Sequence, residues 1–282
     1  MKVVVLGSGT SHGVPVPGCG CPVCLSDDSR DKRLRASVYL EGAGGERAVI
    51  DTGPEFRIQA LRAGIKKLDA VFLTHAHADH LHGLDDIRPF SPVSIPVYGN
   101  SQTLDEFRER FAYIFKKTQQ GGGKPRIETR PVSAGQKISL GNIAVTAVPV
   151  KHGALDIFGW KILENPQNPA ENNEKSFVYL TDVSKIPETS FTLIAEDGKP
   201  GLLVIDGLRQ RPHETHFTFE QAFEAAARIG ARQTYITHIC HSHFHREIET
   251  LCREFTEKQK AAGRISPAWD GLEVELPGKT GF

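Results

Sequence analysis

The sequence has no excess charge and no long apolar run. Its 34 lysine and arginine residues are balanced by 34 aspartate and glutamate residues, so the formal net charge at pH 7 is zero. A neutral chain gives no electrostatic footprint for tight nucleic-acid binding, and we expect no stable nucleic-acid partner. No apolar run approaches the roughly 20 residues that a membrane-spanning helix needs, so we expect no membrane association.

Cysteine is scarce, and the few cysteines are clustered. There are five, and three of them lie within the stretch GCGCPVC, as Cys19, Cys21 and Cys24. An odd number with this clustering argues against a secreted disulfide framework and favours a reduced compartment with metal or thiol chemistry. The first residues, MKVVVLGSGT, contain an apolar run of four residues, which is shorter than the core of a signal peptide. We therefore expect a cytoplasmic protein.

Short apolar runs alternate with segments of helical periodicity. Each apolar run ends in a residue that is able to bind a metal. The helical segments are Phe219–Gly230 and Arg246–Gln259. Strands that alternate with helices predict an α/β fold, and such folds place their sites where strands end. The residues that end the apolar runs are Asp51, His75, His152, Asp182, Asp206 and His238.

The chain contains no stretch that reads as a linker between two domains. No run rich in Pro, Gly and Ser separates its halves, so we expect one domain over residues 1–282. The segment Asn100–Lys117 is predicted to be one helix, while Gly121–Gly123 and Glu164–Lys175 are predicted to be surface loops.

The strongest motif is THAHADH, which directly follows an apolar run. It places His75, His77, Asp79 and His80 within six residues. Imidazole and carboxylate together suit cations such as zinc, manganese or iron, and a pair of metals needs this crowding. The pattern HxHxDH resembles the signature of the metallo-β-lactamase superfamily.

That resemblance extends along the chain and implies a fold and a set of ligands. Members of the superfamily carry a later His, an Asp and a final His after successive strands, and these match His152, Asp182 and His238. The fold implied is a four-layered αββα sandwich. One metal would be held by His75, His77 and His152 and the other by Asp79, His80 and His238, with Asp182 bridging them. Asp79 is also expected to take part in catalysis.

The cysteine cluster resembles one branch of this superfamily more closely. PhnP-like phosphodiesterases, related to the phosphoribosyl cyclic phosphate enzyme of phosphonate catabolism, combine a CxCxxC loop after the first strand with a late THxxH. Here these are the loop at residues 18–24 and THICH, which contains His241. The resemblance implies a closed, structural zinc site made of Cys19, Cys21, Cys24 and His241. Cys240 in place of His241, a redox-active trio and a metal-free turn are the alternatives.

A histidine near the second long helix is the candidate proton donor. His216 lies in HETHFTFEQAFEAA, and phosphodiesterase relatives have a similar His before an Ala-rich helix that leads to the last ligand strand. This similarity implies that His216 is the general acid and orients the phosphate, and His213 is its rival.

These residues predict a dinuclear metal-dependent phosphodiesterase that acts on a small cyclic or nucleotide-like phosphodiester, with manganese or zinc at the catalytic pair. A homodimer is one expected assembly. The alternatives are a nuclease similar to tRNA 3′-processing enzymes, a thioester or lactone hydrolase, and a zinc-loop binding module. No role is predicted for a further set of polar residues, which comprises His12, His82, His243, His245, Asp51, Asp206 and Arg88.

Overall fold

The computed structural model describes residues 1–117, 123–164, 175–259 and 263–276. Most of the two predicted surface loops lies outside these ranges. Glu164, at the start of the second predicted loop, is instead the last residue of a strand.

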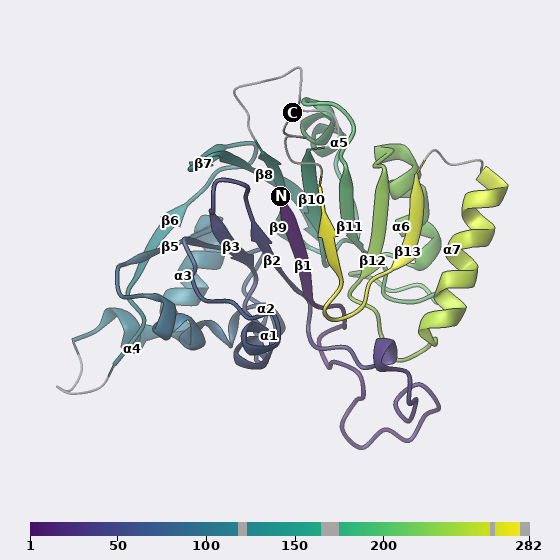
Figure 1. The fold of residues 1–282 in the computed structure, drawn as a ribbon, viewed down its shortest axis with the longest axis horizontal. Coiled ribbons are helices and arrows are strands. Elements are labelled where there is room, and N and C mark those ends of the chain that lie inside the picture. Colours follow the sequence, from purple (N-terminus) through teal and green to yellow (C-terminus); the bar gives the residue numbers. More distant parts are fainter. Residues whose placement is uncertain (118–122, 165–174, 260–262, 277–282) are drawn as a thin grey trace.

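Two seven-stranded sheets face each other within the described part of the chain (Figure 1). The first has the order β14-β1-β2-β3-β4-β5-β6. Its strands are β1 Lys2–Gly7, β2 Ser37–Glu41, β3 Arg47–Ile50, β4 Ala70–Phe72, β5 Ile95–Gly99, β6 Ile127–Pro131 and β14 Glu273–Glu275. From β3 to β6 neighbouring strands run parallel.

The second sheet has the order β13-β12-β11-β10-β9-β8-β7. Its strands are β7 Lys137–Leu140, β8 Ile143–His152, β9 Leu155–Glu164, β10 Ser176–Leu180, β11 Leu202–Asp206, β12 Gln233–Thr237 and β13 Arg264–Pro267. Strands β10 to β13 are parallel. The long hairpin of β8 and β9 pairs Ile143 with Glu164 at one end and His152 with Leu155 at the other.

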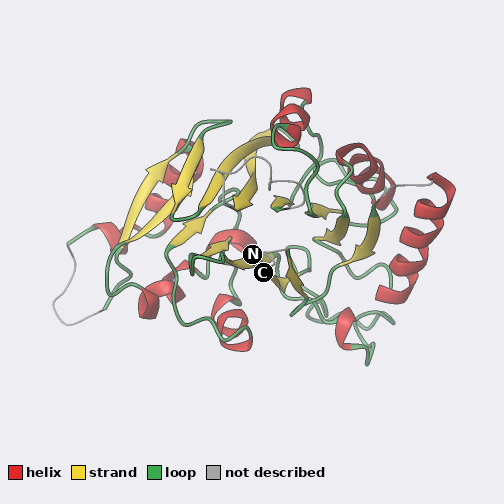
Figure 2. Cartoon of the chain, turned by 45° about the horizontal axis from the view of Figure 1, so that its top comes forward, coloured by secondary structure: helices red, strands yellow, loops and turns green. Residues whose placement is uncertain are grey.

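Helices cover the outer face of each sheet, as Figure 2 shows. Those on the first sheet are α1 Phe56–Arg62, α2 Ala78–Leu81, the 3-10 helix η2 Leu84–Phe90, α3 Ser101–Arg110 and α4 Ala112–Phe115. Those on the second are α5 Glu188–Ala195, α6 Phe219–Ile229 and α7 His245–Gln259. A further 3-10 helix, η1, spans Ser29–Asp31. None of the helices in the described ranges is both long and apolar enough to span a bilayer.

The main core lies between the two sheets. Phe72 of the first sheet packs on Trp160 of the second, with ring centroids 5.0 Å apart, and both side chains are fully buried. Separate apolar clusters lie beneath the helices of each outer face. The predicted α/β sandwich of four layers is therefore confirmed, and its order is helices, sheet, sheet, helices.

The helix predicted over Asn100–Lys117 is two helices. Asn100 caps α3 by accepting a hydrogen bond from the backbone nitrogen of Thr103 at 2.7 Å. Phe111 then leaves helical geometry, with φ −108° and ψ 35°, and buries its ring against Phe107. Burial of Phe111 favours this break over a continuous helix, and Lys116 is already extended after α4.

The carboxyl ends of strands in both sheets carry predicted ligands and Asp206, and β8 runs in the same direction as β10 because both pair antiparallel with β9. His152 and Asp206 are the last residues of β8 and β11, while His75, Asp182 and His238 follow β4, β10 and β12 within three residues. Parallel strands deliver their carboxyl ends to one edge, so both sheets bring these side chains together.

Candidate active site

The segment after β4 carries four predicted ligands into α2. His77 is the N-cap of α2 and has an extended backbone, with φ −62° and ψ 153°. Asp79 and His80 are then the second and third residues of the helix and are buried. The change from extended to helical backbone lets neighbouring side chains of this segment join two different groups of potential ligands.

The segment Asp51–Gly53 supports the backbone of this metal loop. The backbone nitrogen of Thr52 donates to the oxygen of His80 at 2.7 Å, and Gly83 donates to the oxygen of Thr52 at 2.8 Å. A Cβ atom at Gly53 would come 2.2 Å from the backbone oxygen of Asp79. Only glycine allows so close an approach of two backbones.

The first group of potential ligands consists of three imidazoles. Ligand atoms of His75, His77 and His152 lie within 4.8 Å of one another. Nδ1 of His152 donates to the backbone oxygen of Thr215 at 2.8 Å, and Nδ1 of His75 lies 3.0 Å from Oγ1 of Thr74. Holding Nδ1 in this way leaves Nε2 as the free acceptor, which is how a metal-binding histidine is oriented.

The second group combines two carboxylates and two imidazoles. Asp79, His80, Asp182 and His238 are all buried, and their ligand atoms also lie within 4.8 Å of one another. Asp51 orients His80 by a contact of 2.7 Å between its Oδ2 and Nδ1. Asp51 thus lies behind the site and holds a potential ligand in place.

Asp182 lies between the two groups. Its Oδ1 is 4.0 Å from Nε2 of His75 and 3.9 Å from Nε2 of His152, both in the first group. Its Oδ2 is 3.1 Å from Nε2 of His80, in the second group. A carboxylate that faces both groups has the position that a bridging ligand requires.

The donor set fits divalent cations. Nε2 of His75, His80 and His238 is buried, and none of the three forms a hydrogen bond with the described residues. A buried nitrogen that forms no hydrogen bond is costly, and one cation in each of the two groups would satisfy these nitrogens. Imidazole and carboxylate donors suit zinc, manganese or iron.

Electrostatics keep the carboxylates of this cluster ionised. Burial raises the pKa of Asp182, but the neighbouring His238 and His80 outweigh burial and hold this pKa well below its usual range. Burial likewise raises the pKa of Asp79, and His80 and His238 lower it further than burial raises it. Ionised carboxylates are the form that binds a cation.

Three residues of the site have a left-handed backbone. Asp51, Asp182 and His238 have φ values of 61°, 57° and 60°, and they are the non-glycine residues of the described chain with positive φ. Such conformations are sparsely populated and cluster at functional sites. Asp51 and His238 directly follow β3 and β12, and Asp182 lies two residues after β10, so each turn lies at the sheet edge.

His216 lies beside the metal-binding groups and is held by Asp206. Its Nδ1 is 3.1 Å from Oδ2 of Asp206, and its ring stacks on His238 with centroids 4.7 Å apart. Oδ2 of Asp206 also accepts hydrogen bonds from the backbone nitrogens of Val183 at 2.9 Å and Phe217 at 3.3 Å. Fixing Nδ1 leaves Nε2 of His216 to face a substrate. Its rival, His213, is exposed, and its ring lies 5.1 Å from that of His216.

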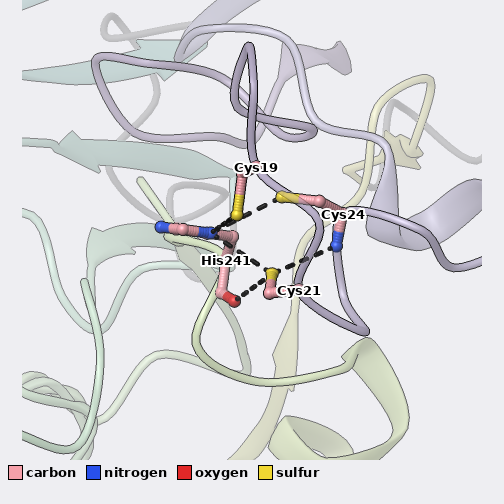
Figure 3. A group of neighbouring side chains, drawn as sticks. All are labelled: Cys19, Cys21, Cys24 and His241. Carbon is pink, nitrogen blue, oxygen red and sulfur yellow. Dashed lines mark hydrogen bonds between the residues drawn. The ribbon is translucent and has the colours of Figure 1, made fainter.

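The cysteine loop meets His241 at a second site, shown in Figure 3. Nδ1 of His241 lies 3.4, 3.4 and 3.5 Å from the sulfur atoms of Cys19, Cys21 and Cys24. A tetrahedral zinc, with bonds of about 2.3 Å to sulfur and about 2.0–2.1 Å to nitrogen, separates such atoms by about 3.5 Å. The four side chains therefore fit a closed zinc site. The sulfur of Cys240 instead lies 3.0 Å from Oγ of Ser242.

Backbone pairing brings this loop to His241 across more than two hundred residues. Thr10 donates to the oxygen of Ile239 at 3.2 Å, and Ile239 donates to the oxygen of Ser8 at 2.9 Å. The chain after β1 thus runs beside the chain after β12. His238 faces the catalytic groups, while His241 reaches the cysteines.

The other polar residues that had no predicted role lie outside every potential metal-binding group of the described residues. His12 is exposed and His245 is buried. The ring of His82 lies 6.2 Å from that of Phe111, and His243 contacts Gln210 at 2.7 Å. Arg88 donates to the backbone oxygen of Gly123 at 2.9 Å.

Three residues that were not predicted to take part support the site. Thr74 hydrogen-bonds Asp51 through both its backbone nitrogen and its hydroxyl, at 2.8 Å each. Thr215 holds His152 through a backbone oxygen, which any residue type would supply. Arg110 of α3 donates to the backbone oxygen of Ala76 within the metal loop. Only Thr74, placed directly before a ligand at a strand end, offered a sequence signal.

Comparison with known proteins agrees with this geometry. Residues 46–239 match the Beta-lactamase superfamily domain. Two facing sheets with a cluster of imidazoles and carboxylates at their shared edge are the architecture of the metallo-β-lactamase fold. The chain belongs to the beta-lactamase superfamily, as its motifs predicted.

Solved structures place the chain within that superfamily. A diphosphatase from the PhnP family is 37% identical, covers 98% of both chains and has a TM-score of 0.81. This likeness confirms the predicted resemblance to the PhnP-like branch. Zinc-bound PqqB from Methylobacterium extorquens shares the fold, with a TM-score of 0.74 and 18% sequence identity. The match covers 98% of this chain and 100% of that chain.

Curated relatives are longer than this chain. An octanoyltransferase of Porphyromonas gingivalis is 38% identical over 99% of this chain and 52% of its own length. A ribonuclease Z of Bradyrhizobium diazoefficiens is 33% identical over 46% of this chain and 44% of its own length. The chain therefore spans about half the length of the curated relatives that it matches.

Proposed function

We propose that this hydrolase is a dinuclear metal-dependent phosphodiesterase that acts on a small cyclic or nucleotide-like phosphodiester of the phosphoribosyl cyclic phosphate type. The observation that carries the proposal is the pair of His216 and Asp206 beside the metal-binding groups. Hydrolysis of a phosphodiester with a poor leaving group needs a proton donor at the leaving oxygen. Thioester or lactone hydrolysis on the same metals would not require this pair.

Each proposed metal has its own set of residues. His75, His77 and His152 would hold one, and Asp79, His80 and His238 the other, with Asp182 shared between them. Two divalent cations at such a site make hydroxide available near neutral pH and stabilise the attacking and leaving oxygens of a phosphodiester.

The chain supplies the remaining catalytic groups. His216 would donate a proton from Nε2 to the leaving oxygen, while the carboxylate of Asp206 stabilises the protonated ring through Nδ1. Asp79, whose side chain is 10% exposed, would orient the attacking water. His152 and Thr215 connect the metal site to the loop that carries His216.

The cysteine site would hold one structural zinc, because all four donors are protein side chains and a closed site leaves no position for substrate. We further propose a small-molecule substrate rather than a stable nucleic-acid partner, since the formal charge of the chain is zero. The expectations of a single domain, a cytoplasmic location and a homodimer stay predictions.

The test is turnover by purified protein loaded with manganese or zinc. We expect hydrolysis of bis(p-nitrophenyl) phosphate and of at least one member of a panel of cyclic phosphates, with metal content measured on the same samples. A fully metal-loaded protein that hydrolyses a thioester or lactone and no phosphodiester would overturn the proposal.

A further inference from the structure

The two groups of potential metal ligands differ in charge and in burial. The second group is fully buried and contains the carboxylates of Asp79 and Asp182, whereas the first group consists of three imidazoles. One of these three, His77, is exposed to solvent. The affinity of a site for a cation rises with the number of charged ligands and with the rigidity of the site. The first group is therefore the weaker site.

The shared carboxylate of Asp182 lies closer to the second group. Its Oδ2 is 3.1 Å from Nε2 of His80, and its Oδ1 is 3.4 Å from Nε2 of His238. The same Oδ1 is 3.9 Å from Nε2 of His152 and 4.0 Å from Nε2 of His75. The charge of Asp182 thus adds to the difference between the two groups.

His77 is also the ligand of the first group whose ring has no orienting partner. Nδ1 of His75 lies against Thr74, and Nδ1 of His152 is held by the backbone of Thr215. The side chain of His77 forms no capping hydrogen bond in α2, and its ring contacts those of His75 and His152, with centroids 4.5 and 5.1 Å away. A ring that lacks such a partner must be positioned through its own backbone.

Arg110 of α3 holds that backbone. Its Nη1 donates to the backbone oxygen of Ala76. This oxygen belongs to the planar peptide unit that joins Ala76 to His77, so the hydrogen bond fixes the plane from which the side chain of His77 projects. Nη2 of the same guanidinium donates to Oε2 of Glu106 at 2.7 Å, one turn earlier in α3. Glu106 thereby keeps the guanidinium in place.

The other end of α3 is anchored beside a second ligand of the first group. Nδ2 of Asn100, the N-cap, donates to the backbone oxygen of Asp156 at 3.0 Å. Asp156 is the second residue of β9, and His152 pairs with Leu155 at the start of the same hairpin turn. One helix therefore contacts both the segment that carries His77 and the hairpin that carries His152.

We propose that Arg110 is a positioning residue for the metal held by His75, His77 and His152, and that this metal is the more weakly bound of the two. Arg110 contacts neither metal nor substrate in this role, since it acts through the backbone of Ala76. The catalytic site then fills in order, with the second group first. This inference rests on the dinuclear site of the proposed function.

The experiment titrates manganese into the full chain after a mild chelator has removed the catalytic metals, with zinc at the cysteine site checked by elemental analysis. Free manganese is counted from its electron paramagnetic resonance signal, so the readout does not depend on turnover. Wild-type protein should bind two manganese ions in two steps. Arg110→Ala should raise the Kd of the weaker step roughly 10- to 100-fold, the usual effect of losing a group that orients a ligand, and leave the tighter step within about threefold.

Three further variants define the effect. His77→Ala, at an exposed position, should abolish the weaker step and keep the tighter one, which assigns the two steps to the two groups. Arg110→Lys should restore part of the affinity, because an ammonium group can also donate to a carbonyl oxygen. Glu106→Gln, which leaves Arg110 in place, should weaken the same step by a smaller factor than Arg110→Ala does.

The matched control is Arg108→Ala, which removes the same charge from the same helix. Arg108 donates to Oδ1 of Asp105 at 2.8 Å and to Oγ1 of Thr129 at 2.5 Å, rather than to the metal loop. Both steps should therefore stay within about threefold of wild type. The side chain of Arg110 is 35% exposed, so thermal melts of the two alanine variants should match wild type.

Several results would overturn the inference. They are two equal steps in wild type, loss of the tighter step in His77→Ala, and equal weakening of both steps, or of neither, in Arg110→Ala. Protein that shows the expected two steps but hydrolyses no phosphodiester overturns the proposed function and leaves Arg110 as the positioning residue. Protein that hydrolyses phosphodiesters and titrates unchanged in Arg110→Ala does the reverse.

Discussion

Asp206 contacts His216 and faces His238 with the two oxygens of one carboxylate. Oδ2 lies 3.1 Å from Nδ1 of His216, and Oδ1 lies 3.7 Å from Nδ1 of His238. The backbone nitrogen of Val183 fixes the same carboxylate at 2.9 Å. The carboxylate that holds the proposed proton donor therefore also lies beside a potential metal ligand.

Substitution Asp206→Asn should lower kcat for phosphodiesters by roughly 10- to 100-fold, the usual effect of removing a group that orients a ligand or donor. The amide retains the size of the side chain but not the charge that stabilises a protonated His216. The measurement is kcat with metal content on the same sample. Glu214→Gln, an exposed carboxylate change in the same loop, is the control and should have little effect on kcat.

Substitution His216→Ala should depend on the leaving group. The rate with substrates that have poor alkoxide leaving groups should fall by roughly two to four decades. The rate with nitrophenyl phosphodiesters should fall far less, because nitrophenolate leaves without a proton. Metal content should stay the same. Equal losses on both substrates would point to phosphate binding rather than proton donation, and no loss on either would favour acyl chemistry.

Substitution Asp182→Ala should abolish phosphodiester turnover while the circular dichroism spectrum stays native. Asp182 faces both groups of imidazoles, so its removal should also lower the metal content of the catalytic site. A variant with a near-normal rate would exclude Asp182 as the shared ligand.

Substitution Cys21→Ser should release roughly one zinc per chain and lower the melting temperature, because a structural zinc contributes directly to folding. Cys240→Ser is the matched control, since its sulfur contacts Ser242 and lies outside the cluster. Metal analysis and thermal melts decide the matter. Loss of zinc in Cys240→Ser, or its retention in Cys21→Ser, would contradict the assignment of ligands.

Substitution Gly53→Ala should weaken metal binding at the catalytic site and destabilise the fold by about 1–3 kcal/mol, because its methyl group would overlap the backbone of Asp79. A metal titration and a denaturant melt measure the two effects. At Gly123 the nearest atom to an added Cβ is 3.5 Å away, so Gly123→Ala should change neither.

The alternation of strands and helices predicted an α/β fold with its site at strand ends, and the family resemblance implied the four-layered sandwich. Apolar runs ending in His or Asp mark strands whose carboxyl ends meet at one edge, and the resemblance supplied the order of the ligands. The structure brings His75, His152 and Asp182 together from three different strands. That they bind metals stays a prediction.

Features that depend on backbone contacts could not be read from residue types. Thr215 holds His152 with a carbonyl oxygen, and Arg110 reaches the backbone of Ala76 from a separate helix. The break at Phe111 was missed because helical propensity gave no sign that burying one aromatic ring would outweigh a continuous helix. Asp206 was identified as a strand-end carboxylate, but its partner His216 is set by the tertiary fold.

The left-handed backbone at Asp51, Asp182 and His238 has an evolutionary consequence. Each strained residue costs of order 1–3 kcal/mol, and glycine would adopt the same backbone without that cost. A selection for thermal stability alone should therefore enrich glycine at these three positions and, with it, inactive protein. Directed evolution of this chain needs a turnover screen beside every stability screen, since relief of this strain by glycine removes a side chain of the site.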